Sequence, residues 1–327
     1  MNKIALAIHG GAGTILRSEM TAELEKEYRN GLENALKKGW EILQKKGSAL
    51  DTVEAAVVEL ENFPLFNSGR GAVFTHEGKN ELDASIMDGK TLKAGAVAFV
   101  KNVVNPIHLA RLVMEKTEHI LLAGRGADEF AREMNVELAD DAYFFTEHRY
   151  EQLIKARDQG IVQLDHTVEE PKIIEEISDS KFQISDSEIQ KPFGTVGAVA
   201  CDFAGNLAAA TSTGGMTNKK FGRIGDTPIV GAGTYAENAT CAVSCTGHGE
   251  FFMLGATAFD VSARMKYKNL SLEQAAQEAI NYQTEIGGEG GLIAVDNQGN
   301  VTLPFNSDGM YRGFVTADGE IKIEIYK

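Results

Sequence analysis

The sequence predicts an α+β protein in which β-sheets stack face to face and helices cover their outer sides. Strand-like segments come in bursts and helix-like segments in pairs in both halves of the chain, without the strict strand–helix alternation of a doubly wound fold. The composition agrees with a layered globular protein, because 43% of the residues are hydrophobic and 34 glycines accompany only 6 prolines. With 327 residues, the chain can form one large or two ordinary domains.

The first half begins with an apolar strand at 3–8 that leads into the glycine-rich turn HGGAG. Helical periodicity follows over 21–46. A second helix is expected to begin at Ser48, where Asp51 is a capping partner, and to end before Pro64. The other elements expected here are strands at 71–75, 81–87, 94–100 and 119–123, a helix from Pro106, and helices at 126–134 and 146–157.

Residues 158–193 break this pattern. The run from 161 to 193 has no glycine, and it is strongly acidic. By composition it is a linker, and it is longer than an ordinary connection within a compact domain. Strands and helices then resume. We expect strands at 195–201, 206–213 and 240–246, helices at 249–266 and 271–284, and strands at 291–296, 300–304 and 312–316.

The net charge and the cysteine content limit which binding partners and which cellular compartment we expect for the protein. The formal net charge of −15 opposes binding to a phosphate backbone, so we expect no nucleic-acid partner. Three cysteines without a CxxC pair fit a reducing compartment. The sequence shows no signal-peptide cleavage pattern and no apolar run of the roughly 18 residues that a membrane span needs. We therefore expect a cytoplasmic protein without membrane contact.

Common catalytic and cofactor motifs are missing. The sequence has no GxSxG elbow, no HExxH and no complete P-loop, and its seven histidines lack the spacing of a zinc site. HGGAG at 9–13 is similar to an esterase oxyanion loop, but without a nucleophile elbow it is interpreted as a turn that ends a strand. GAGTYA at 231–236 fits a loose dinucleotide-binding pattern but precedes strand-like residues. An uncut protein that binds a nucleotide phosphate through GAGTYA is kept as an alternative of a different class.

The junction of Gly194 and Thr195, at the start of the apolar run TVGAVAC, allows two interpretations. In the first, Thr195 opens a strand and its hydroxyl faces solvent. In the second, the bond before Thr195 is cut. The freed α-amine, with a reference pKa of about 7.7 to 8.0, could then accept the proton of the hydroxyl on the same residue. Glycine before the threonine would tolerate a strained bond there.

The run GTVGAVACDFAGNLAAATSTGGMTNKKFGRIGDTPIVGAGTYAEN, followed by AVSCTGHGE, resembles the plant-type L-asparaginase and isoaspartyl peptidase family of N-terminal-nucleophile hydrolases. HGGAG, LENFPLFNSGRGAVFT and ELDASIMDG match the same family in order, so the resemblance covers the chain except the linker. It implies a single domain, 1–327, with a four-layer αββα sandwich. It also implies cleavage into an α chain, 1–194, and a β chain, 195–327, and assembly as a dimer of αβ units.

The resemblance assigns the reaction to four residues. Thr195, freed by cleavage after Gly194, is the expected nucleophile, and Thr213 would orient its hydroxyl and amine. Thr246 and Gly247 would stabilise the negative oxygen of the intermediate with a hydroxyl and a backbone N–H. The implied reactions hydrolyse asparagine to aspartate and ammonia, and β-aspartyl dipeptides to aspartate and an amino acid. The related glycosylasparaginase reaction, on asparagine-linked sugar, is a close alternative.

Substrate binding is assigned to a charged pair and its neighbours. Arg223 and Asp226 would hold the α-carboxylate and the α-ammonium, because a guanidinium donates two parallel hydrogen bonds to a carboxylate. Gly247 and Gly249 would add backbone contacts, and Asn67 would act near the nucleophile through water.

The resemblance implies no cofactor for the chemistry but a structural sodium ion. Its expected ligands are main-chain carbonyls of one loop, and the Arg70 side chain there is a candidate for setting leaving-group preference. The carbonyls belong to Leu60, Glu61, Phe63, Phe66, Ser68 and Arg70.

Overall fold

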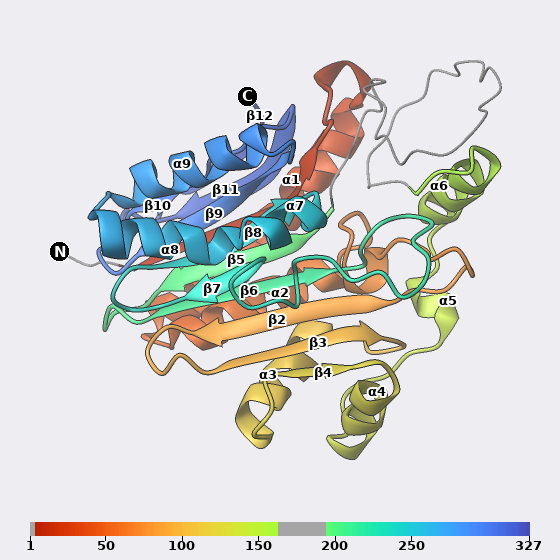
Figure 1. Ribbon diagram of the computed structural model, residues 1–327, viewed down its shortest axis with the longest axis horizontal. Coiled ribbons are helices and arrows are strands. Elements are labelled where there is room, and N and C mark those ends of the chain that lie inside the picture. The colour runs from red at the N-terminus through yellow and green to blue at the C-terminus, as the bar shows by residue number, and fades with distance from the viewer. Residues whose placement is uncertain (1–3, 163–193) are drawn as a thin grey trace.

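The computed structural model describes residues 4–162 and 194–327. Within these residues the strands form two sheets (Figure 1), a large one in the order β12-β11-β1-β5-β6-β2-β3-β4 and a small one in the order β10-β9-β8-β7. The large sheet consists of β1 (Ala5–Gly13), β2 (Leu82–Asp88), β3 (Ala94–Val100), β4 (Leu121–Ala123), β5 (Val196–Cys201), β6 (Leu207–Thr213), β11 (Gly309–Val315) and β12 (Ile321–Tyr326). The small sheet consists of β7 (Thr234–Ala236), β8 (Cys241–Gly247), β9 (Gly290–Asp296) and β10 (Val301–Thr302).

Helices contact the two sheets on separate sides. Helices α1 (Ala22–Gln44), α2 (Ala49–Asn62) and α3 (Pro106–Lys116) contact strands of the large sheet, whereas α8 (Thr257–Lys268) and α9 (Leu272–Glu285) contact the small one (Figure 1). The others are α4 (Gly124–Glu133), α5 (Asp141–Phe144), α6 (Glu147–Asp158) and α7 (Gly249–Leu254). None of the helices in the described part has the length and apolar character that a membrane span requires.

The buried side chains form three apolar clusters that follow the two-residue period of the strands. In β1, Leu6 and Ile8 belong to the cluster that packs against α1 and α2, while Ala5 and Ala7 belong to the cluster between the two sheets. A third cluster, which includes Val243, joins β8 and β9 to α8 and α9. Both faces of these strands are covered, which agrees with their mostly apolar sequences. The mixed helix-and-strand class predicted from the sequence is confirmed.

Strand pairing brings the ends of several strands to one place. β5 lies between β1 and β6 and runs antiparallel to both, with His9 opposite Gly197 and Val196 opposite Ser212. The start of β5, just after Thr195, therefore lies beside the end of β6. β8, which ends at Gly247, packs across β5 and β6 from the small sheet.

Three predicted elements are wrong in part. No strand forms at 71–75, because side-chain amides take the place of a partner strand: Asn67 accepts from Val73 N, and Asn80 donates to the Ala72 and Val73 carbonyls. The helix predicted at 249–266 is broken between α7 and α8, where Ala256 adopts a left-handed conformation with φ 44° that a continuous right-handed helix excludes.

HGGAG is likewise not a turn that ends the first strand. β1 continues through it to Gly13 and stays paired with β11, with an irregularity in register between His9 and Gly11. Gly11 has φ 112°, a conformation that glycine adopts without penalty. The strands β7 and β12 and the short helix α5 were not predicted. The expected linker at 158–193 lies mostly outside the described residues.

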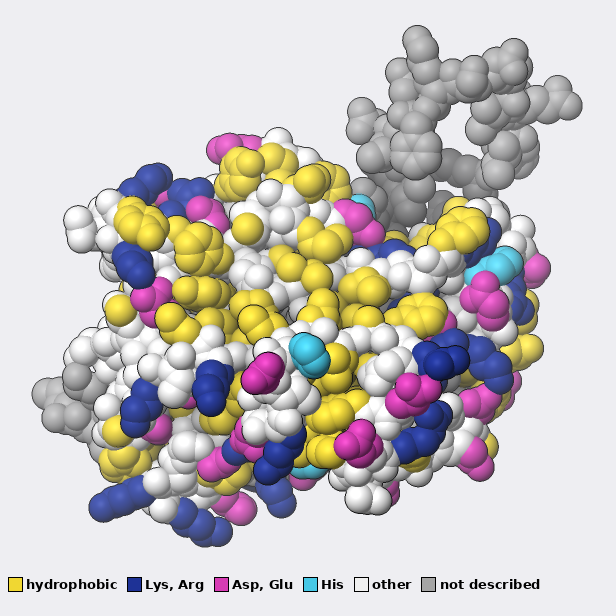
Figure 2. All heavy atoms as spheres, turned by 60° about the horizontal axis from the view of Figure 1, so that its bottom comes forward, with side chains coloured by type: hydrophobic (Ala, Val, Ile, Leu, Met, Phe, Trp, Pro, Cys, Tyr) yellow, Lys and Arg dark blue, Asp and Glu magenta, His cyan; other side chains and the backbone are white. Residues whose placement is uncertain are grey.

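On the face shown in Figure 2, Lys and Arg side chains lie among Asp and Glu side chains, and hydrophobic side chains gather in a band across the middle. The described atoms on this face therefore offer no continuous basic surface, as expected for a chain with a net charge of −15.

Candidate active site

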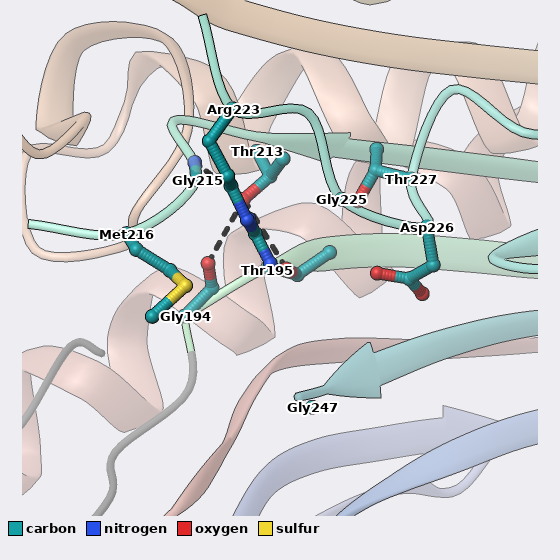
Figure 3. A pocket seen from close by; sticks show the side chains of 10 residues that line it. All are labelled: Gly194, Thr195, Thr213, Gly215, Met216, Arg223, Gly225, Asp226, Thr227 and Gly247. Carbon is teal, nitrogen blue, oxygen red and sulfur yellow. Dashed lines mark hydrogen bonds between the residues drawn. The ribbon is translucent and has the colours of Figure 1, made fainter. Parts of the chain in front are cut away.

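A pocket lies where β5 begins and β6 ends (Figure 3). Six of the residues that line it belong to the predicted site, and they come from three separate parts of the chain. The lining consists of Gly194, Thr195, Thr213, Gly215, Met216, Arg223, Gly225, Asp226, Thr227 and Gly247.

The hydroxyl of Thr195 faces protein atoms. Thr195 is 7% exposed, and its Oγ1 lies 3.2 Å from Thr213 Oγ1. Thr213 Oγ1 in turn donates to the Gly194 carbonyl at 3.0 Å and accepts from Gly215 N at 3.0 Å. Thr195 does stand at the opening of a strand, but the interpretation that its hydroxyl faces solvent is wrong. Thr195 precedes β5, whose ladder partners fix the direction in which the chain enters the pocket.

The Gly194 carbonyl accepts two hydrogen bonds. One comes from Thr213, and the other comes from Asn67 Nδ2 at 2.8 Å. The same Asn67 amide donates to the Gly215 carbonyl at 2.8 Å. Asn67 is thus in direct contact with the residue before Thr195. Two donors on one carbonyl oxygen would stabilise negative charge that develops there.

The predicted binding pair lies on the loop between β6 and β7. Arg223 Nε and Nη2 each lie 2.8 Å from a carboxylate oxygen of Glu250, in the first turn of α7. A Cβ built on Gly249 would come within 2.9 Å of both Arg223 Nη2 and Asp226 Oδ1. A side chain at position 249 would therefore force one of these charged groups to shift. Glu250 was not among the residues predicted for the site, although it directly follows Gly249 in the run AVSCTGHGE.

Asp226 is buried, and its Oδ2 has no hydrogen-bond partner among the described residues. Burial raises the pKa of Asp226 to about 7, against the opposing effect of the nearby Arg223 charge. An unpartnered buried carboxylate oxygen is costly. A ligand ammonium in this pocket would satisfy it.

Thr246 and Gly247 lie at the end of β8, on the other side of the pocket. Gly247 lines the pocket, whereas Thr246 is fully buried and its Oγ1 accepts from Ala12 N at 3.3 Å. The HGGAG segment therefore contacts the threonine that was predicted to stabilise the oxyanion.

The loop expected to bind sodium concentrates oxygen atoms. A Cβ on Gly71 would lie 2.1 Å from the Phe66 carbonyl and 2.6 Å from the Pro64 carbonyl. Ser68 Oγ is buried without a hydrogen-bond partner in the described chain. This donor set suits a hard cation. The described residues contain no group of three or more His, Cys, Asp or Glu that could hold a metal, so main-chain and hydroxyl oxygens would have to do so.

Two arginines at this loop have different contacts. Arg149 of α6 is buried and donates to the carbonyls of Leu65 and Gly71 at 2.9 Å each. It thereby binds carbonyls that are not among the expected sodium ligands. Arg70 lies over the ring of Tyr143, 5.6 Å from its centroid, and does not line the pocket around Thr195.

Comparison with known proteins identifies the class of this protein as a hydrolase, because the model of the asparaginase family matches residues 2–325. The chain belongs to that asparaginase family, as its motifs suggested. It is 47% identical to a putative isoaspartyl peptidase/L-asparaginase of Dictyostelium discoideum over 99% of both chains. It is 49% identical to an isoaspartyl peptidase of Salmonella typhimurium over 100% of both, and 48% identical to that of Escherichia coli over 100% of this chain and 97% of the relative.

Proposed function

We propose that this chain cuts its own peptide bond between Gly194 and Thr195 and then hydrolyses L-asparagine and β-aspartyl dipeptides. The observation that carries the proposal is the buried hydroxyl pair of Thr195 and Thr213, in one pocket with Arg223 and Asp226. The names of relatives that match 99% or more of this chain include isoaspartyl peptidase and L-asparaginase.

Self-cleavage would begin when Thr195 Oγ1 attacks the carbonyl carbon of Gly194. The bond to the Thr195 nitrogen breaks, that nitrogen takes up a proton, and an ester remains between Gly194 and the Thr195 hydroxyl. Water hydrolyses the ester, which leaves a carboxylate on the α chain, 1–194, and a free amine on the β chain, 195–327. Asn67 and Thr213 are placed to stabilise the Gly194 oxygen during the attack, since both contact it in the intact chain.

In turnover, the free amine of Thr195 accepts the hydroxyl proton, and the oxygen attacks the side-chain carbonyl of the substrate. Thr246 and Gly247 stabilise the resulting oxyanion. Ammonia or an amino acid leaves, and water hydrolyses the β-aspartyl ester to aspartate. No cofactor takes part in these steps.

Arg223 and Asp226, here called the clamp, account for two substrate classes. Asparagine and β-aspartyl dipeptides share a free α-carboxylate, for Arg223, and a free α-ammonium, for Asp226 and the Gly249 main chain. They differ only in the amine that leaves. The lack of room for a Cβ between Gly249 and both side-chain heads supports this assignment.

Three further features complete the proposal. The layers of helix, sheet, sheet and helix form the four-layer αββα sandwich of N-terminal-nucleophile hydrolases. The oxygen-rich loop at 60–71 holds a structural sodium ion. The cleaved αβ units pair as a dimer in the cytoplasm, and exposed apolar side chains such as Leu254 of α7, 79% exposed, are available to a second copy.

Intact-mass measurement and an ammonia assay test the proposal together. Wild-type protein is expected to yield a fragment that begins at Thr195 and to release ammonia from asparagine. Thr195→Ala is expected to stay uncut and inactive, whereas Thr195→Ser keeps a hydroxyl and is expected to retain part of both reactions. Ammonia release by uncut Thr195→Ala protein would refute the nucleophile. Wild-type protein that stays full-length after long incubation would favour the nucleotide-binding alternative. Turnover of an asparagine-linked sugar in preference to both substrates would favour the glycosylasparaginase.

A further inference from the structure

His9 of β1 is a buried titratable group that the proposed reaction does not use. Its Nδ1 lies 3.0 Å from the Thr195 carbonyl oxygen, and its Nε2 lies 2.9 Å from Ser244 Oγ in β8. The ring therefore joins the residue that carries the nucleophile to the small sheet. The paired stretch of β1 and β5 ends at His9 and Gly197, so Thr195 lies beyond the last ladder partner on this side.

The hydrogen-bond partners of His9 determine which nitrogen carries the proton. A carbonyl oxygen only accepts, so Nδ1 must carry the hydrogen. Burial lowers the pKa of His9 to about 3, which keeps the imidazole neutral and leaves Nε2 as an acceptor. Ser244 therefore donates to Nε2 and accepts from Thr211, whose Oγ1 lies 2.7 Å away and also lies 3.3 Å from the Gly233 carbonyl, a second acceptor for its hydrogen. Thr211 in turn contacts the hydroxyl of Thr234. The donors of Ser244 and His9 thus point the same way, toward the Thr195 carbonyl.

Gly197 provides the room for this arrangement. A Cβ at Gly197 would lie 2.0 Å from Ser244 Oγ and 2.5 Å from His9 Nε2. The bond between His9 and Ser244 thus passes directly against the β5 backbone, two residues after Thr195. Any side chain at Gly197 would displace one of the two groups.

We infer that His9 is a positioning residue for the nucleophile, and that Ser244 holds the orientation of the His9 ring. The inference rests on the proposed function. After cleavage, Thr195 keeps one covalent connection, its peptide bond to Val196. The hydrogen bond from His9 holds the plane of that peptide, and the plane sets where the amine and the hydroxyl of Thr195 lie. Thr213 holds the hydroxyl itself. The two contacts together replace the constraint that the bond to Gly194 supplied.

The sharpest test compares two buried serines. Ser244→Ala removes the donor to His9, and Ser262→Ala removes a hydroxyl of equal burial whose partner is Thr240, 2.6 Å away. We expect kcat, per mole of fragment that begins at Thr195, to fall about tenfold in Ser244→Ala with KM changed less than about twofold, because a misplaced nucleophile slows the chemical step. Ser262→Ala is expected to keep the wild-type kcat.

Rescue separates positioning from packing at His9 itself. His9→Ala is expected to lower kcat about 10²-fold, and His9→Asn, whose amide N–H can replace Nδ1–H, is expected to recover most of that loss at an equal melting temperature. Equal kcat in Ser244→Ala and Ser262→Ala, a change confined to KM, or no recovery in His9→Asn would overturn the inference. Wild-type protein that neither cuts itself nor releases ammonia would instead refute the proposed function.

Discussion

Thr195 and Arg223 face the same pocket, but the chain holds them in different ways. Thr195 enters the pocket from β5, whose residues pair with neighbours on both sides in the middle of the large sheet. Arg223 lies on the irregular loop between β6 and β7, where scattered main-chain hydrogen bonds, such as that from Arg223 N to the Lys220 carbonyl at 3.1 Å, replace a continuous strand ladder. Arg223 is bound by Glu250, and the buried Lys219 donates to the Glu81 carbonyl at 3.0 Å.

This difference indicates that cutting and substrate binding are separable. The nucleophile depends on main-chain pairing that a single side-chain substitution leaves in place, together with the few contacts that hold Thr195 and Gly194. The clamp depends on charged contacts that one substitution removes. Changes in the loop should therefore alter KM and leave self-cleavage intact, whereas changes around Gly194 should do the opposite.

The largest effect is expected from Arg223→Ala. Truncation of one partner of a hydrogen-bonded charge pair costs roughly 2 to 5 kcal/mol, so kcat/KM for asparagine should fall about 30- to 5,000-fold, chiefly through KM. Self-cleavage should proceed at the wild-type rate, because the intact chain presents no α-carboxylate to Arg223. Steady-state kinetics and a mass-spectrometric time course of cutting measure the two. Arg223→Lys keeps the positive charge but cannot donate two parallel hydrogen bonds from a guanidinium. Its kcat/KM should lie between those of the wild type and Arg223→Ala. Equal slowing of cutting and turnover would show that the two sides are not separable.

Asn67→Ala should have the converse effect. It removes one of the two donors to the Gly194 carbonyl, and loss of one such donor typically costs about 10²-fold in rate, so cutting should slow to that extent. The control is Asn80→Ala, since Asn80 also donates to two loop carbonyls but none at Gly194. If both variants cut equally slowly, Asn67 supports the loop only and does not act on the Gly194 oxygen.

The sequence predicted the strand side of the site better than the loop side. The apolar runs after Thr195 and before Thr213 show strand patterning within a few residues, so both strands could be located. The fork between Arg223 and Glu250 spans 27 positions, and the bond from His9 to Thr195 spans 186, which no local period indicates. The residues 71–75 are apolar enough for a strand, yet their backbone groups bond to Asn67 and Asn80 side chains. Apart from the interpretation of Thr195 as a freed nucleophile, the roles of individual residues came from the family resemblance.

A smaller, pH-dependent effect is expected at Asp226. Binding of a substrate ammonium needs the ionised carboxylate, but burial raises the pKa of Asp226 to about 7, so the group is increasingly protonated below that pH. KM for asparagine should therefore rise as pH falls through 7, approaching tenfold for each further pH unit, while the substrate amine stays charged. Asp226→Asn should raise KM at every pH and flatten this dependence. A wild-type KM that stays constant from pH 8 to pH 5.5 would contradict the assignment.

The smallest effect is expected from Glu250→Gln. Glu250 accepts two hydrogen bonds from Arg223, whereas the amide of glutamine accepts with only one oxygen. The Arg223 guanidinium is therefore held less firmly in Glu250→Gln. Since 43% of the Glu250 side chain is exposed, solvent weakens the ion pair, and we expect KM for asparagine to rise only about three- to tenfold with kcat and cutting unchanged. The matched control is Glu278→Gln, which weakens the Arg264 pair of similar exposure on α8 and α9 and should leave KM unaltered. A lower KM in Glu250→Gln would mean that Glu250 competes with the substrate carboxylate for Arg223. Arg223 would then stay paired with Glu250 until a ligand displaces Glu250. Thr195, by contrast, is held in place by β5 both before and after a ligand binds.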